Sequence, residues 1–199
     1  MLQVALATED EVSEAVGSRL ISEWGSRLEV GLRLRRGGYG YLRSRMKNFC
    51  EMARRSPVLV ITELDRTVCP AALCSEWTRR LSRPAGLLLR VAVREIEAWL
   101  LADHDAIRSF FGRAAAGRLP DRTDAIEYPK EFLLDLALRA PRDVRDDLTP
   151  GRGSLSSQGL GYNPRLTQYV YQYWDPQRAS QRSPSLARTR QRLRDLAPK

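Results

Sequence analysis

The sequence predicts an α/β protein with a mostly parallel central sheet flanked by helices and a helical extension at its carboxyl end. Short apolar runs alternate four times with helix-like segments over the first half of the chain, and one run is apolar throughout. Beyond Asp105 the chain is helical in pieces. Strands that alternate with helices indicate a parallel sheet, because each helix returns the chain for another strand in the same direction.

The first two units each read as strand, break and helix. Residues 2–7 form a short apolar run that ends at Thr8, Glu9 and Asp10, and apolar residues then recur at helical spacing from Val12 to Ile21. Residues 28–34 alternate like a half-buried strand. The glycine-rich residues 35–40 break this strand, and a helical stretch follows to about residue 54. We interpret Gly37, Gly38 and Gly40 as a tight turn rather than a phosphate loop.

The next two units supply the buried centre of the sheet. Residues 57–62 are apolar, as expected of a strand covered on both faces, and they end in Glu63, Leu64 and Asp65. Pro70 opens a helix to about residue 81. Residues 86–93 predict a fourth strand that runs into a helix over 94–103, whose apolar side chains share one face.

The remaining residues predict an extension rather than a second sheet. Helices are expected over 129–138 and 184–196, with a polar, glycine-rich loop over 149–161 that could be a hinge, a lid or disordered. We therefore predict an α/β core over residues 1–103 and a helical, loop-rich extension over 104–199, packed together as one compact domain.

Composition indicates a soluble, cytoplasmic protein without membrane attachment. No apolar run approaches the length of a membrane span, and the amino terminus meets acidic residues too early for a secretory signal. Three cysteines cannot all pair internally, and a single histidine leaves them short of zinc ligands, so we expect free thiols. That histidine, His104, also lacks a nucleophile motif nearby, which argues against triad hydrolases.

Positive charge is concentrated at the carboxyl end. The formal net charge is +9, and residues 151–199 contain eight arginines and one lysine against two aspartates. Such a tail suits a nucleic-acid partner, because neutralised phosphates release counterions, but solvated helix faces of an arginine-rich protein explain it equally well. Aromatic residues at 169–174 could stack on unpaired bases, although core packing is the favoured interpretation.

Carboxylates follow the ends of three predicted strands, where parallel sheets bind their ligands. These are Glu9, the pair Glu63 and Asp65, and either Glu95 or Glu97. Residues two apart in an extended chain point the same way, so Glu63 and Asp65 can face one ion. Hard oxygen ligands suit Mg²⁺ or Mn²⁺. Acidic residues after strands also serve as helix caps and turn formers, which leaves a structural alternative open.

Two further acidic positions belong to the fourth unit. Glu95 and Glu97 flank opposite sides of the apolar stripe, so at most one should face the pocket, and we take Glu97 as the additional catalytic candidate. Asp103 is expected to cap the next helix, with Asp105 in its first turn.

A family resemblance adds to these observations. A glutamate after the first strand, with Glu63-Leu64-Asp65 after a later one, resembles the Toprim fold of primases, topoisomerases and overcoming-lysogenization-defect nucleases. Longer stretches resemble a small bacterial Toprim-like family of unknown function over nearly the whole chain: residues 91–103, Tyr128-Pro-Lys130, Gly161-Tyr-Asn163 and Ser183-Pro-Ser-Leu186.

The resemblance implies a magnesium- or manganese-dependent nuclease. Glu9 matches the Toprim glutamate and Asp65 the second aspartate of the Asp-x-Asp motif, while Glu63 replaces the first aspartate with a longer arm. Hydrolysis is favoured over strand passage, because no tyrosine can be placed as a topoisomerase nucleophile. Bound metal would activate water and stabilise charge on a phosphodiester of DNA or RNA.

The resemblance also implies partners. Members of this family are encoded beside ATPases of the ABC or SMC-like type, often in anti-phage defence loci, so an ATPase subunit is the expected partner and oligomers are compatible with this role. Arg94 and Lys130 are candidate charge stabilisers, and together with Arg188 and Arg190 they are the expected nucleic-acid contacts. The alternative is a catalytically inactive module that binds nucleic acid or the partner.

Overall fold

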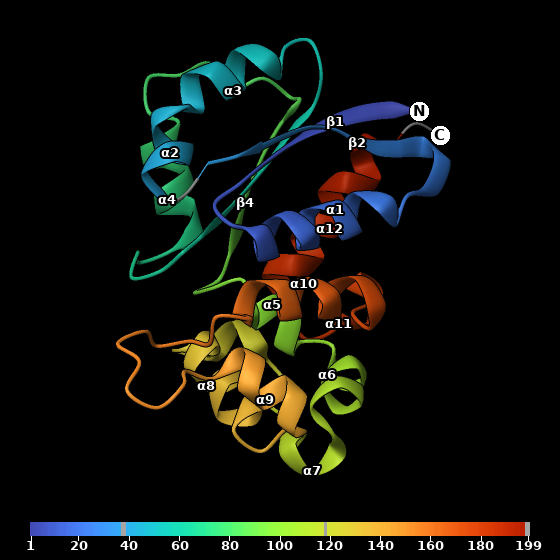
Figure 1. Ribbon diagram of the computed structural model, residues 1–199. Helices are drawn as coiled ribbons and strands as arrows, with labels where there is room; N and C mark the ends of the chain where they lie inside the picture. The colour runs from blue at the N-terminus through green and yellow to red at the C-terminus, as the bar shows by residue number, and fades with distance from the viewer. Residues whose placement is uncertain (37–38, 118, 198–199) are drawn as a thin grey trace.

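Four parallel strands form the sheet of the computed structural model, which describes residues 1–36, 39–117 and 119–197 (Figure 1). The strand order is β2-β1-β3-β4, with every neighbouring pair parallel. The strands are β1 (Leu2–Thr8), β2 (Leu28–Arg35), β3 (Val58–Glu63) and β4 (Leu87–Ala92). The predicted α/β fold with a parallel sheet is confirmed.

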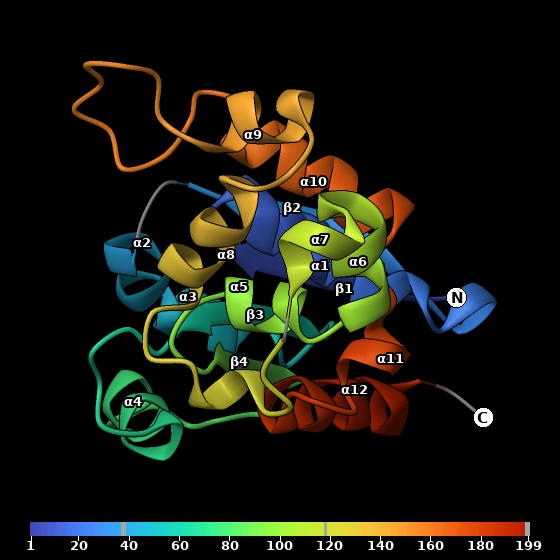
Figure 2. The ribbon, with the colours of Figure 1, turned by 90° about the horizontal axis from the view of Figure 1, so that it is seen from below.

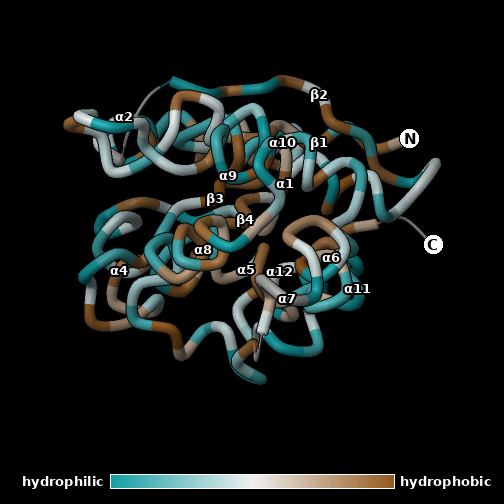
Figure 3. The backbone as a smooth tube through the Cα atoms, turned by 60° about the horizontal axis from the view of Figure 1, so that its bottom comes forward, coloured by the Kyte–Doolittle hydropathy of each residue, from teal (hydrophilic) through white to brown (hydrophobic). Residues whose placement is uncertain are grey.

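Side-chain alternation along the strands divides the core into two layers. Val4 and Leu6 of β1 join one hydrophobic cluster, whereas Ala5 and Ala7 join another on the opposite face. This period of two is the geometry of an extended strand, and it explains why the inner strands are apolar at nearly every position. Figure 3 shows the hydrophobic segments of β3, β4 and α5 running through the middle of the molecule.

Different helices cover the two faces. The cluster containing Ala5 and Ala7 packs on α2 (Tyr39–Ser44), α3 (Met46–Met52) and α4 (Pro70–Trp77). The cluster containing Val4 and Leu6 packs on α1 (Glu11–Ser22), α10 (Tyr162–Gln172) and α12 (Pro184–Leu196). Carboxyl-terminal helices therefore complete the core of the amino-terminal sheet.

The other helices lie beyond the carboxyl ends of the strands, on the side where α5 follows β4. They lie below the strands in Figure 1 and in front of them in Figure 2. They are α5 (Glu97–Leu101), α6 (His104–Phe111), α7 (Arg113–Ala116), α8 (Pro129–Ala137), α9 (Arg142–Leu148) and α11 (Pro176–Ala179), with short 3₁₀ turns at Gly25–Arg27 and Thr123–Ala125.

Several boundaries differ from those predicted. The stretch to residue 54 consists of two helices, α2 and α3, rather than one. The helix expected from residue 94 begins at Glu97, because Arg94 has a φ of 68° that no right-handed helix accommodates. Strand β2 lies at an edge of the sheet and leaves Leu32 61% exposed, so its burial does not alternate cleanly. Gly37 and Gly38 of the predicted turn lie outside the described residues.

The predictions for the 149–161 loop and the cysteines are met, and the prediction for the aromatic residues is met in part. Residues 149–161 contain no helix or strand. The three cysteines are free thiols. Tyr169 and Trp174 are buried in the core, as the packing interpretation required, while Tyr171 and Tyr173 remain exposed. In the described part of the chain, no helix is both long and apolar enough to cross a membrane.

Candidate functional site

The carboxyl ends of β1, β3 and β4 bring together the acidic residues predicted from the sequence. Glu9 directly follows β1, Glu63 is the last residue of β3, and Glu97 is the first residue of α5, which follows β4. Asp65 lies two residues beyond β3. We call Glu9, Glu63, Asp65 and Glu97 the acidic cluster.

Glu9 is held against the end of β3. The Thr62 hydroxyl donates a hydrogen bond of 2.5 Å to Glu9 Oε1. Burial raises the pKa of Glu9, the hydrogen bond from Thr62 opposes that rise, and the nearby charges of Asp65 and Asp10 add to it. The charges of neighbouring carboxylates therefore act on Glu9, although Glu9 follows β1 and Asp65 follows β3.

Glu63 faces Glu97. The backbone amide of Ile96 donates a 2.8 Å hydrogen bond to Glu63 Oε1, which ties the end of β3 to the start of α5. Burial raises the pKa of Glu63 well above its ordinary value, and the charge of Glu97 is the next largest cause. Two carboxylates that repel each other in a buried place resist being ionised together.

Glu97 is the most enclosed member of the acidic cluster. Only 5% of its surface is exposed, and the Tyr162 hydroxyl donates a 2.7 Å hydrogen bond to Glu97 Oε1. Burial raises the pKa of Glu97 to about 7, despite the opposing hydrogen bond from Tyr162. A carboxyl group with a pKa near neutrality can give or accept a proton under physiological conditions.

Asp65 and Arg94 form a strained junction beyond β3 and β4. Both have left-handed backbones, with φ of 48° and 68°, although neither is glycine. Asp65 N donates to Arg94 O at 2.9 Å, and Arg94 Nη1 donates to Asp65 O at 3.0 Å. Non-glycine residues held in this region cluster at functional sites, because surrounding contacts must hold the strained conformation in place.

An open pocket of about 680 Å³ adjoins this junction. Its walls carry both acidic and basic side chains: Asp65, Arg66, Thr67, Arg94, Glu95, Glu127, Tyr128 and Glu131. Of the pair Glu95 and Glu97, only Glu95 lines the pocket, so the expectation that at most one would face it holds. The member that lines it is not the one we selected, because Glu97 turns inward toward Tyr162.

The motif segments named in the sequence surround the chain that carries Glu97. Lys130 N donates to Glu95 Oε2 at 2.8 Å, and Tyr162 holds Glu97. Trp99 Nε1 donates to Ser185 Oγ at 2.7 Å. Each of these segments, far apart in the sequence, therefore positions residues 95–99. Their roles could not be assigned from spacing, because none is adjacent to a strand end.

Asp103 is structural, as predicted. Its carboxylate accepts from Ala106 N at 3.2 Å as the cap of α6, and it also pairs with Arg178 at 2.8 Å. Asp103 is completely buried, so Arg178 supplies the charge that offsets its desolvation.

The basic candidates occupy three different environments. Arg94 lines the pocket beside Asp65, and Lys130 Nζ lies 4.9 Å from the centre of the Tyr162 ring. Arg188 lies elsewhere, at the edge of β4. Arg190 forms an ion pair with Glu23 and donates to Ser180 Oγ at 2.6 Å. Contacts within the protein therefore occupy the guanidinium of Arg190.

The donor set of the acidic cluster suits a hard divalent cation only in part. Among the described residues, no three Asp, Glu, His or Cys side chains converge closely enough to hold one metal ion together. Internal hydrogen bonds occupy one oxygen each of Glu9, Glu63 and Glu97. Mg²⁺ commonly uses one or two protein carboxylates and completes its shell with water and substrate phosphate. The arrangement fits that kind of site rather than a three-carboxylate cage.

Comparison with known proteins identifies no relative: no family model, curated protein or solved structure matches the chain.

Proposed function

We propose that this protein is a metal-dependent nuclease of Toprim-like architecture that hydrolyses phosphodiesters at the acidic cluster. The observation that carries the proposal is the placement of four carboxylates just beyond the ends of three neighbouring strands, where burial and the charges of Glu97 and Glu9 raise the pKa of Glu63. Within the described residues no lysine or arginine forms an ion pair with any of the four. A divalent cation would supply the missing positive charge.

The residues would divide the work by their position. Glu9, Glu63 and Asp65 are the proposed ligands of Mg²⁺ or Mn²⁺, one or two of them directly and the rest through water. The metal when bound would activate water and neutralise charge on the phosphodiester. The Arg94 guanidinium donates a hydrogen bond to the carbonyl oxygen of Asp65 and so holds the Asp65 backbone in place. Glu97, with a pKa of about 7, is suited to exchange a proton near the site.

The proposed partner is an ATPase of the ABC or SMC-like type, with a role in anti-phage defence. The support is the resemblance of residues 91–103 and the three shorter motifs to a family encoded beside such ATPases. The three shorter motifs also share a location, because each forms a hydrogen bond with a residue between Glu95 and Trp99.

The deciding experiment measures cleavage of DNA and RNA with Mg²⁺ or Mn²⁺, by the protein alone and with its neighbouring ATPase. We expect cleavage that Glu9→Gln and Asp65→Asn each reduce about a hundredfold or more. Both variants keep the local geometry, because glutamine can still accept from Thr62 and asparagine tolerates the left-handed backbone at residue 65.

Glu51→Gln on α3 is the matched control, because Glu51 is exposed and far in sequence from the strand ends. Its cleavage rate should equal that of the unaltered protein. Absence of cleavage in every metal and with the ATPase would refute the proposal.

A second candidate is a binding module without catalysis. The specific observation in its favour is that Glu9 and Glu63 already accept hydrogen bonds from Thr62 and Ile96, with no third ligand converging among the described residues. Nucleic-acid or ATPase binding that survives Glu9→Gln and Asp65→Asn, without any cleavage, would support this alternative.

A further inference from the structure

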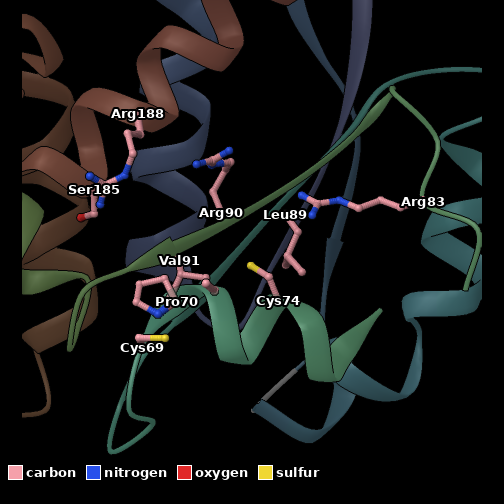
Figure 4. Close-up of a pocket in the computed structure, with 10 residues that line it drawn as sticks. Cys69, Pro70, Cys74, Arg83, Leu89, Arg90, Val91, Ser185 and Arg188 are labelled. Atoms are coloured by element: carbon pink, nitrogen blue, oxygen red, sulfur yellow. The ribbon is translucent and has the colours of Figure 1, made fainter. Parts of the chain in front are cut away.

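A second cavity lies along the free edge of the sheet, away from the acidic cluster (Figure 4). Its volume is about 390 Å³, within the range of small-molecule sites. Four segments form it: α4, the segment before β4, the edge strand β4, and α12. The lining residues are Cys69, Pro70, Ala71, Cys74, Arg83, Leu89, Arg90, Val91, Ser185 and Arg188.

Three arginines dominate the charge of this cavity, and we call it the arginine pocket. Arg90 extends from β4, Arg188 from α12, and Arg83 from the segment before β4, as Figure 4 shows. Within the described residues, none of the three forms an ion pair with a carboxylate. No acidic side chain of the described residues lines the cavity.

Arg90 is the central member. Its Nε atom is buried and has no hydrogen-bond partner among the described residues, which is unfavourable for a charged group. Burial lowers the pKa of Arg90, the nearby Cys74 opposes this shift, and the charges of Arg192, Arg83 and Arg188 add to it. A partly buried guanidinium normally pairs with an anion. In this pocket the chain supplies cations instead.

The backbone adds further positive character. The amino terminus of α4 opens onto the pocket at Pro70 and Ala71, and helix amino termini carry partial positive charge that attracts phosphates. In the described part of the chain no strand pairs with the outer side of β4, so one row of its backbone groups faces away from β3. Leu89, Val91 and Pro70 provide apolar wall beside the charged groups.

We propose that the arginine pocket binds a phosphate-bearing ligand of about nucleotide size. Guanidinium groups donate paired hydrogen bonds to phosphate oxygens, and the apolar wall suits a ribose or base. The phosphate could belong to a free nucleotide or to the backbone of a nucleic acid. This site does not depend on the proposed nuclease function, because none of its residues belongs to the acidic cluster.

The test measures binding of AMP, inorganic phosphate and a short single-stranded oligonucleotide in EDTA, which removes any divalent metal. The double variant Arg83→Gln, Arg188→Gln should weaken binding about tenfold or more, the loss expected for a charge-assisted hydrogen bond. Both side chains are exposed, so the variant should fold normally. Arg90→Gln should also weaken binding of these ligands and provides a second, independent test.

Matched controls separate this site from general charge effects. Arg139→Gln removes an exposed arginine just beyond the carboxyl end of α8, outside the pocket lining, and should leave affinity unchanged. Glu9→Gln with Asp65→Asn should leave the affinity for AMP and for inorganic phosphate unchanged, because neither residue lines the arginine pocket, even if every nuclease assay fails. Binding of AMP would identify a nucleotide site, whereas binding of the oligonucleotide alone would identify a backbone contact.

Cysteine alkylation gives a direct readout of occupancy. Cys69 and Cys74 line the pocket and are partly exposed, whereas Cys50 is buried elsewhere. The bound ligand should slow alkylation of Cys69 and Cys74 by iodoacetamide, measured by mass spectrometry, in the unaltered protein but not in the double variant. Equal affinity and equal alkylation in all variants would overturn the proposal.

Discussion

The acidic cluster and the arginine pocket both gather like charges, but the protein treats the two groups differently. Hydrogen bonds from Thr62, Ile96 and Tyr162 each reach one carboxylate oxygen of Glu9, Glu63 and Glu97, and Glu97 is almost completely buried. In the arginine pocket Arg90 Nε has no partner among the described residues, and Arg83 and Arg188 extend to the surface.

The two groups differ in how electrostatic repulsion between their like charges can be reduced. Buried carboxylates can relieve repulsion by taking up protons, which is why burial and neighbouring charge raise their pKa values. Arginine cannot lose its proton at physiological pH, so the arginine pocket can relieve repulsion only by moving apart or by binding an anion. Protein stability should therefore respond to pH at the acidic cluster and to anions at the arginine pocket.

The largest expected effect is a pH dependence of stability in EDTA. The pKa of Glu97 rises from its ordinary 4.5 to about 7 in the folded protein, so between these values the folded state binds more protons than the unfolded state. Stability should therefore fall as pH rises through this window, by up to about 3 kcal/mol. Urea unfolding across the pH range measures this loss.

Glu97→Gln should flatten that profile, because glutamine keeps an oxygen that accepts from Tyr162 but does not ionise. Arg139→Gln should leave the profile unchanged. An equally steep fall in the Glu97→Gln variant would assign the pH dependence to other groups, with Glu63 the first to examine.

The second effect is stabilisation by divalent cation. If the acidic cluster binds Mg²⁺, a concentration tenfold above the dissociation constant should raise the free energy of unfolding by about 1.4 kcal/mol. Thermal melting at constant ionic strength measures this effect. Glu9→Gln with Asp65→Asn should abolish it, whereas Arg83→Gln with Arg188→Gln should preserve it. An equal response in both double variants would locate the metal elsewhere.

The smallest effect concerns the arginine pocket without ligand. Arg90→Met removes one of several repelling charges and a buried Nε without a partner, while methionine keeps an apolar stem. We expect the free energy of unfolding to stay constant or increase by about 1 kcal/mol in phosphate-free buffer. The variant should also lose any stabilisation by added phosphate. A large loss of stability would show that Arg90 supports the fold itself.

Local sequence patterns accounted for most of the helices and strands. The apolar run at 57–62 predicted β3 because a strand covered on both faces has no polar side to present. The helix predicted over 184–196 is observed as α12, and the structure adds its cap, the Ser183 hydroxyl that accepts from Leu186 N at 3.2 Å. Asp103 was correctly predicted as a cap. Each of these features depends on residues a few positions apart.

The acidic strand ends were also evident from the sequence, because parallel strands place their carboxyl ends at one edge. Their detailed arrangement was not. Glu63 turns to the amide of Ile96, and Glu97 turns to Tyr162, across 33 and 65 residues respectively. Residue spacing cannot predict contacts over such sequence distances, since they depend on how α5 and α10 pack.

What the sequence determined by itself is an α/β chain with carboxylates at strand ends, since hydrophobic periodicity and capping are local properties. Tertiary structure alone decided the strand order, the inward turn of Glu97 and the assembly of the arginine pocket. That pocket joins Arg83, Arg90 and Arg188 from three segments. They meet because α12 returns from the end of the chain to pack beside β4, and burial of its apolar face drives that return.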